Sequence, residues 1–194
     1  MKKMRMIIPV VLILALAFVS CQKIIYQYLQ GVDKDIVPYR WGESYRFVDG
    51  QGDTVALSVN TVEDEWNTDL SDAMGDIWVQ YRIITMSSAS GDIGLWFVIS
   101  GKAYGGSRNE RELSFTLSPS GLGTIIEYNS SGGFIKDTGS YWYQQVYDSL
   151  LIGDRMYYNV AERVKPDTYK VYYNKAYGVL QVQNSDKIVL RRIP

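Results

Sequence analysis

Apolar and polar residues alternate along most of the chain after Tyr45, and this period of two is typical of half-buried β-strands. The two clearest runs cover residues 77–84 and 95–100, where every second position is apolar. The polar, glycine-containing segment 87–92 separates them. Because two alternating runs joined by a short turn form an antiparallel pair, we expect them to form the central hairpin of a sheet.

Shorter runs with the same alternation occur on both sides of this hairpin. They cover residues 45–49, 54–59, 113–117, 123–128, 141–151, 155–164, 169–182 and 188–190. Turn-forming segments rich in Gly, Asn, Asp and Ser separate most of them. About ten short antiparallel strands with local turns and at most short helices predict an all-β domain. We expect a curled meander sheet, closed as a barrel or half-barrel, with a two-layer β-sandwich as the alternative.

Two segments do not follow the alternation. Residues 62–76 contain six acidic side chains, and their spacing does not match a calcium-binding EF-hand loop, so we expect a solvent-exposed acidic loop and no metal site. Residues 22–38 contain apolar positions spaced for one face of a brief helix that ends near Gly31. We interpret residues 21–44 as a short tether ahead of a single β domain at 45–194.

The N-terminus has the organisation of an export signal. Three basic residues precede an apolar run over residues 6–19, and the small residue Ser20 stands directly before Cys21. The apolar run is shorter than the roughly 20 residues that a membrane-spanning helix needs, and Pro9 interrupts it. Residues 1–20 are therefore predicted to be a signal peptide. The alternative is an ordinary signal that happens to contain a cysteine, or a buried thiol.

Phe18-Val19-Ser20-Cys21 resembles the lipobox of bacterial lipoproteins, although Phe18 stands where most members have Leu. The resemblance implies that Cys21 carries a diacylglycerol, that the chain is cut before it, and that a fatty acid such as palmitate acylates the new N-terminus. Attachment by two or three acyl chains is stable. Gln22 follows Cys21, whereas an Asp there resembles an inner-membrane retention signal. We therefore expect an outer-membrane lipoprotein that faces the periplasm.

Composition excludes several functions. Cleavage before Cys21 removes three basic residues, so the net charge falls from −1 to −4 and no basic surface for nucleic acid is expected. The chain has no His, and Cys21 is its only cysteine. Ser-His-Asp and Cys-His nucleophiles and imidazole metal sites are thus excluded. Paired carboxylates or Ser-Lys chemistry remain, but we expect neither an enzyme nor a cofactor.

The chain is rich in aromatic residues, with sixteen Tyr and five Trp. Six of them lie in or near two neighbouring predicted strands and form a candidate aromatic surface for a ligand: Tyr141, Trp142, Tyr143, Tyr147, Tyr157 and Tyr158. The alternative is that these side chains pack within the sheet, because aromatic residues favour strands and cross-strand pairs.

The C-terminal part, from Tyr169 to Leu190, contains an aromatic strand, a Tyr-Gly turn and two further apolar strands. This arrangement resembles the closing hairpins of Bacteroidota-type lipoproteins that have no assigned activity. Residues 38–47 are similar to the opening strand of such proteins. The resemblance implies a lipid-anchored β protein, and it identifies no catalytic residue.

Three functions follow from these observations. The first is a non-catalytic binding or interaction domain for an apolar ligand or a partner protein of the cell envelope. The second is an accessory carbohydrate-binding lipoprotein, and the third is a carboxylate-based hydrolase. An apolar interior cavity would favour the first, a coplanar row of exposed aromatic rings the second, and two facing buried carboxylates the third.

Overall fold

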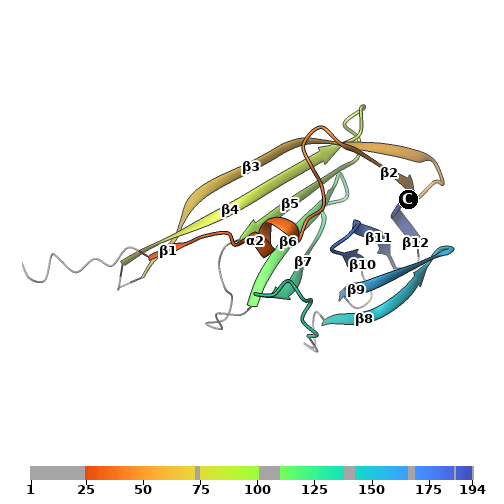
Figure 1. The fold of residues 1–194 in the computed structure, drawn as a ribbon. Helices are drawn as coiled ribbons and strands as arrows, with labels where there is room; N and C mark the ends of the chain where they lie inside the picture. Colours follow the sequence, from red (N-terminus) through yellow and green to blue (C-terminus); the bar gives the residue numbers. More distant parts are fainter. Residues whose placement is uncertain are drawn as a thin grey trace, which may run out of the picture.

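The computed structural model describes residues 25–72, 75–100, 110–137, 143–165, 169–185 and 187–193. Within them lie one short helix and twelve strands (Figure 1). Their bounds are β1 Ile25–Gln27, α2 Gly31–Asp35, β2 Ser44–Asp49, β3 Thr54–Asp72, β4 Gly75–Ser87, β5 Gly94–Ser100, β6 Glu110–Ser118, β7 Leu122–Asn129, β8 Tyr143–Ile152, β9 Arg155–Lys165, β10 Tyr169–Asn174, β11 Gly178–Asn184 and β12 Lys187–Arg192. None of the helices in these ranges has the length and hydropathy of a membrane span.

The strands form one sheet with the order β7-β6-β5-β4-β3-β2-β12-β11-β10-β9-β8, and β1 pairs in parallel with β4. Neighbours in this order are consecutive in the chain, except where β12 pairs with β2. That pairing curls the sheet into a nearly closed barrel, whose one unsealed seam lies between β7 and β8. The prediction of an all-β curled meander is therefore confirmed. The predicted central hairpin is β4 and β5, with Ile84 opposite Phe97.

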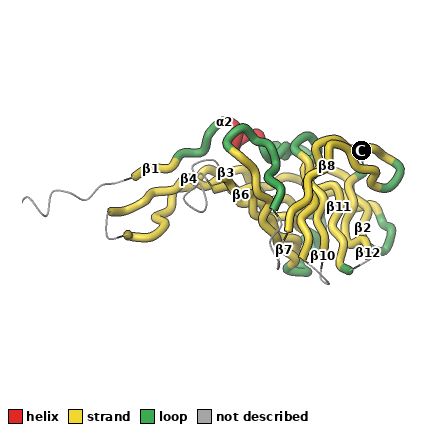
Figure 2. Tube along the Cα trace, turned by 90° about the horizontal axis from the view of Figure 1, so that it is seen from below, coloured by secondary structure: helices red, strands yellow, loops and turns green. Residues whose placement is uncertain are grey.

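The prediction of an acidic loop over residues 62–76 is wrong. Residues 62–72 continue β3, and they pair with β4 as far as Asp72 opposite Gly75. Residues 63–68 are all exposed, so the three consecutive acidic residues Glu63, Asp64 and Glu65 can stand in a strand without any cost of burial. The far ends of β3 and β4, together with β1, extend beyond the barrel (Figures 1 and 2). We call this extension the arm.

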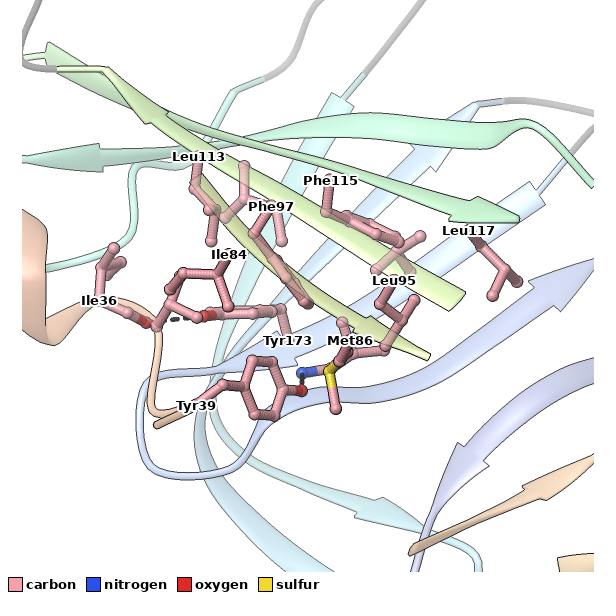
Figure 3. Packing of buried hydrophobic residues seen from close by; sticks show 14 of the residues in the cluster. Ile36, Tyr39, Ile84, Met86, Leu95, Phe97, Leu113, Phe115, Leu117 and Tyr173 are labelled. Atoms are coloured by element: carbon pink, nitrogen blue, oxygen red, sulfur yellow. Dashed lines mark hydrogen bonds between the residues drawn. The ribbon is translucent and has the colours of Figure 1, made fainter. Parts of the chain in front are cut away.

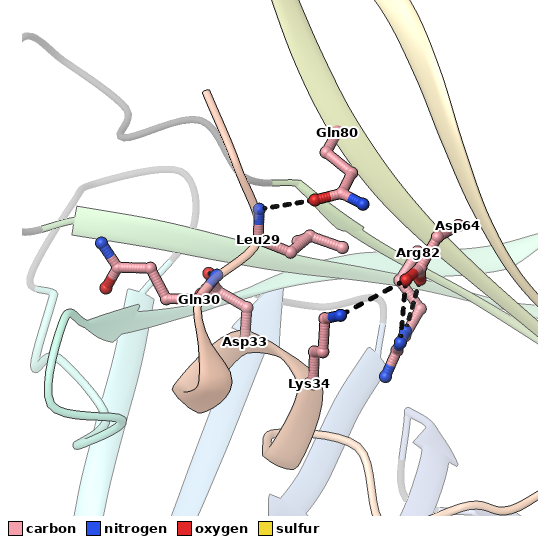
Figure 4. A network of polar contacts seen from close by, with 7 residues as sticks. All are labelled: Leu29, Gln30, Asp33, Lys34, Asp64, Gln80 and Arg82. Carbon is pink, nitrogen blue, oxygen red and sulfur yellow. Dashed lines mark hydrogen bonds and ion pairs between the residues drawn. The ribbon is translucent and has the colours of Figure 1, made fainter. Parts of the chain in front are cut away.

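The prediction of a brief helix that ends near Gly31 is also wrong, because the helix begins there. The residues before it form β1, and the Leu29 N–H donates a hydrogen bond to the Gln80 side-chain oxygen at 3.1 Å (Figure 4). Leu29 is buried, so the segment packs onto the sheet. The predicted opening strand starts only at Ser44, and residues 38–43 are irregular.

Side chains fill the inside of the barrel. Aromatic and aliphatic residues of β4, β5 and β6 pack there against Ile36 and Tyr39 from the segment after α2 (Figure 3). The Tyr173 hydroxyl donates a hydrogen bond to the Ile36 carbonyl at 2.7 Å. The rings of Phe97 and Phe115 stack with centroids 6.0 Å apart. This interior is therefore a packed core.

A buried ion pair holds α2 against the barrel. Asp33 is fully buried, and its carboxylate lies 3.1 Å from the Arg111 guanidinium on β6. It also accepts hydrogen bonds from the Tyr128 hydroxyl at 2.9 Å and from the Gln30 N–H at 2.6 Å. Burial, followed by the neighbouring Asp33 charge, raises the pKa of Tyr128 well above its usual range. The charge of Asp33 is thus compensated inside the protein.

Side chains close one end of the seam between β7 and β8. The Gln144 amide donates to the carbonyls of Glu127 and Ile135, both at 2.7 Å, and its oxygen accepts from the Glu127 N–H at 3.0 Å. Arg163 forms ion pairs with Asp137 at 3.1 Å and with Glu127 at 3.6 Å. Together with a backbone bridge between Asp137 and Gln144, these contacts link β7 and the segment after it to β8 and β9. A pocket of about 340 Å³ lies beside them, next to Thr124 and Arg163.

Candidate binding cleft

A cleft of about 720 Å³ lies where the segment between α2 and β2 crosses the barrel. Its walls come from the end of α2, from that segment, and from β3 and β4. The lining residues are Lys34, Asp35, Val37, Pro38, Tyr39, Arg40, Trp41, Glu43, Tyr45, Val62, Arg82 and Ala176. Aromatic rings and charges of both signs therefore face one hollow on the surface.

Tyr39 fixes the wall of the cleft to the barrel. Its ring is buried and packs edge-on against Tyr45, with centroids 4.9 Å apart. Its hydroxyl oxygen accepts a hydrogen bond from the Val179 N–H at 2.8 Å. Burial raises the pKa of Tyr39 to about 12. Gly178 has a φ of +76°, and a Cβ at this position would lie 2.2 Å from the Tyr39 hydroxyl oxygen, so only glycine leaves room for the ring.

Tyr45 lies at the base of the cleft and is held from two sides. The Arg192 guanidinium lies over its ring, 4.4 Å from the centroid, which is a cation–π contact. Its hydroxyl donates to the Glu43 carboxylate and accepts from the Arg40 N–H at 3.3 Å. Burial, followed by the hydrogen bond to Glu43, raises the pKa of Tyr45. These contacts keep the side chains of Tyr45 and Glu43 in a defined position.

Two cationic residues of the cleft lining, Lys34 and Arg82, belong to an ion-pair network (Figure 4). Arg82 on β4 makes two hydrogen bonds to Asp64 on β3, at 2.7 and 3.0 Å. Lys34 at the end of α2 reaches the same carboxylate at 3.5 Å. The hydrogen bond from Arg82 holds the pKa of Asp64 below its usual value. The network joins α2 to the arm and places two cationic groups beside the cleft.

Trp41 is the most exposed of the large hydrophobic side chains in the described residues, at 72%. It lies in a tight turn in which the Glu43 N–H donates to the Arg40 carbonyl at 3.1 Å. The next residue, Gly42, has a φ of +79°, and its N–H donates to the Val59 carbonyl at 3.1 Å. The turn is therefore fixed to β3, and the indole ring is presented to solvent at the rim of the cleft.

The cleft has the chemistry of a binding surface for a polar partner. It offers one large aromatic face, the cations Lys34, Arg40 and Arg82, and the carboxylates Asp35 and Glu43. In the part of the chain that the structure describes, no three residues of the types His, Cys, Asp and Glu come together where they could hold a metal ion. Such a cleft can bind through stacking, hydrogen bonds and charge.

The structure describes four of the six aromatic residues predicted to form a ligand surface, and these four do not form one open surface. Tyr141 and Trp142 lie outside the described residues. Tyr157 is buried in a second, smaller apolar cluster with Ile152, Val160 and Leu180. Tyr143 is half-buried, and only Tyr158 is exposed. The ligand surface proposed from the sequence stays a prediction.

Tyr147 instead belongs to a polar cluster that sequence reasoning missed. Glu162 on β9 is buried and accepts hydrogen bonds from the Tyr147 hydroxyl at 2.6 Å and from the Tyr172 hydroxyl at 3.0 Å. The hydrogen bond to Glu162, followed by burial, raises the pKa of Tyr147 to about 12. Two phenols thus satisfy one buried carboxylate, which is a structural arrangement.

Sequence reasoning also missed the cleft. The sequence pattern predicts a strand over residues 38–47 and does not distinguish Trp41 from its neighbours. A signal was present, because an aromatic residue between Arg40 and Gly42 after Pro38 is typical of a turn that exposes its side chain. Val59 on β3, which pairs with the turn, and Arg82 on β4, which also lines the cleft, come from distant parts of the chain, so periodicity could not reveal them.

Cys21, the predicted lipidation site, lies outside the described residues. Comparison of the chain with protein-family models, with curated proteins and with solved structures finds no match.

Proposed function

We propose that this protein is a lipid-anchored, non-catalytic binding domain of the bacterial cell envelope, which holds a partner protein in the cleft at Trp41. Acyl chains on Cys21 anchor it to the outer membrane on the periplasmic side. The observation that supports this proposal best is an indole ring with 72% exposure at the rim of a cleft of about 720 Å³ that also contains arginines.

The composition of the cleft supports a protein partner. Trp, Tyr and Arg are the residue types enriched at the energetic centres of protein interfaces. Trp41, Tyr45, Arg40 and Arg82 all line this hollow, and their backbone is held by the turn and by the Asp64 network. A rigid site loses little conformational entropy on binding. Because the barrel interior is a packed core, a site on the surface is favoured over an apolar ligand inside.

Carbohydrate is the second candidate partner. Trp41 presents its ring beside Arg40 and Glu43, so a sugar could stack on the indole and exchange hydrogen bonds with both charged groups. The cleft does not favour a hydrolase, because Glu43, one of its two carboxylates, already accepts a hydrogen bond from Tyr45. We therefore propose binding without catalysis.

Crosslinking in the intact envelope tests this function. A photoreactive benzoylphenylalanine replaces Ser44, which is exposed and follows the turn but does not line the cleft, and Trp41 stays in place. We expect a discrete adduct with one envelope protein, lost when Trp41→Ala is added. Trp96→Ala is the matched control, because Trp96 is also exposed, at 53%, but lies on β5 away from the cleft lining. An adduct that survives Trp41→Ala would contradict the proposal, and binding to a glycan array that needs Trp41 would favour carbohydrate.

A further inference from the structure

Three aromatic rings lie together on the surface of the arm. Tyr26 is 52% exposed, Tyr28 61% and Trp66 40%. The Trp66 ring packs edge-on against both tyrosines, with centroids 5.8 Å from Tyr26 and 5.1 Å from Tyr28. We call these three residues the arm patch. Large aromatic side chains that gather on a surface, instead of being scattered, mark a contact site.

The arm patch is close in the chain to the proposed lipid anchor. Tyr26 is five positions after Cys21, and an extended chain spans at most about 3.6 Å per residue, so their Cα atoms are no more than about 18 Å apart. Tyr26 is fixed to the arm, because β1 pairs with β4 at Tyr26 opposite Trp78. If acyl chains hold Cys21 at the membrane, the arm patch must therefore lie at or near the bilayer surface.

The residue types of the arm patch suit the interface between water and hydrocarbon. Tyr and Trp are enriched there, because their rings are apolar while the hydroxyl and indole N–H stay hydrated. The headgroup region of one leaflet is roughly 5 to 8 Å thick. The ring centroids of the patch are 5.1 to 6.2 Å apart, so all three rings fit into this layer together.

The charge of the arm determines which lipids suit it. Between Thr54 and Tyr81 the sequence has six acidic residues and no Lys or Arg. One of the six, Asp64, is paired with Arg82 and Lys34. Glu63 and Glu65 are exposed next to Trp66 in the chain. Anionic headgroups would repel this surface within a Debye length, whereas zwitterionic headgroups would not. The arm patch is thus complementary to a zwitterionic membrane surface.

We propose that Tyr26, Tyr28 and Trp66 insert into the headgroup layer of a zwitterionic membrane and fix the arm there. This inference rests on the proposed lipid anchor at Cys21. The arm then acts as a spacer, because β3 and β4 continue from the patch to the barrel (Figures 1 and 2). The cleft at Trp41 is thereby held at a fixed orientation to the membrane.

Tryptophan quenching tests the insertion. The lipidated full-length mature protein is reconstituted into phosphatidylcholine vesicles whose acyl chains carry bromine near the headgroup, and its fluorescence is compared with that in unbrominated vesicles. We expect quenching that is largely lost with Trp66→Phe and unchanged with Trp96→Phe, because Trp96 lies on β5 of the barrel. We also expect less quenching when phosphatidylglycerol replaces part of the phosphatidylcholine.

The outcomes separate the two proposals. If the protein floats with the vesicles but Trp66→Phe does not reduce the quenching, the insertion of the arm patch is overturned and the anchor stays intact. Protein that does not float with vesicles would overturn the anchor itself. Quenching that increases with phosphatidylglycerol would contradict the choice of a zwitterionic surface. A dimer in detergent that Trp66→Phe dissociates would assign the arm patch to a second copy of the chain, and so overturn the membrane contact.

Discussion

Replacing Gly178 by Ala tests how the wall of the cleft is fixed. Gly178 starts β11 with a φ of +76°, and the added Cβ would lie 2.2 Å from the hydroxyl oxygen and 2.4 Å from Cζ of Tyr39. These are atoms of a buried ring that also accepts a hydrogen bond from Val179, so the ring cannot move without losing contacts. We expect Gly178→Ala to displace Tyr39 and to weaken the docking of residues 36–43.

The loss of stability expected for Gly178→Ala has two parts. A left-handed backbone costs an L-residue roughly 1 to 2 kcal/mol relative to glycine. Overpacking in a core adds roughly 1 to 3 kcal/mol. Gly91 is the matched control, because its φ is +77° and a Cβ there would meet no atom within 4 Å. We therefore expect the free energy of unfolding to fall by about 2 to 5 kcal/mol for Gly178→Ala. For Gly91→Ala we expect only the backbone contribution of about 1 to 2 kcal/mol.

Urea unfolding of the mature chain with Cys21→Ser, followed by fluorescence, measures both values. The slope of the free energy against urea should stay constant, so that the shift in midpoint reports stability. Equal losses for Gly178→Ala and Gly91→Ala would refute the reasoning, because they would show that Tyr39 is not seated against Gly178.

Two further predictions concern buried polar groups. Asp33→Ala removes the carboxylate of a buried ion pair, and we expect urea unfolding to show a free energy of unfolding lower by about 3 to 5 kcal/mol. Asp35→Ala, at an exposed position, should change it by less than about 0.5 kcal/mol. Similar effects of the two substitutions would contradict the buried pair. In a spectrophotometric pH titration, Tyr39 and Tyr147, with pKa values of about 12, should stay neutral at pH 11 while tyrosines with the usual pKa near 10 ionise. The raised pKa values favour the neutral phenols in the folded state. The free energy of unfolding should therefore be unaffected below about pH 10 and fall as the pH rises to about 12. A constant free energy of unfolding between about pH 10 and about pH 12 would contradict this prediction.

Local periodicity predicted the strands that have one buried face. In β5 every second residue from Leu95 to Ile99 is buried, and the alternation is visible in the sequence. The sequence pattern failed for residues 62–72 of β3, because residues 63–68 are exposed on both faces of the strand and leave no alternation to detect. The local turns predicted a curled, barrel-like sheet, but they could not identify the pair of strands that curls it, since Leu190 of β12 pairs with Asp49 of β2 across most of the chain.

The candidate sites could be predicted only in part, because their residues also have partners on distant strands. Tyr147 and Tyr157 were chosen from the sequence as surface residues, but a buried Glu162 and a second apolar cluster engage them instead. Those partners come from other strands, and no local pattern identifies them. Trp41 and the arm patch depend on which turn is exposed and on how β1 pairs, and both are properties of the folded chain.

The central claim is that this domain is held at a membrane through Cys21. The most direct test is mass spectrometry of the N-terminal peptide of the protein isolated from the envelope of its own host. We predict a peptide that begins at Cys21 and carries a diacylglycerol thioether with an additional acyl group. A peptide with residues 1–20 still attached, or with a free thiol at Cys21, would contradict the lipid anchor and, with it, the membrane contact of the arm patch.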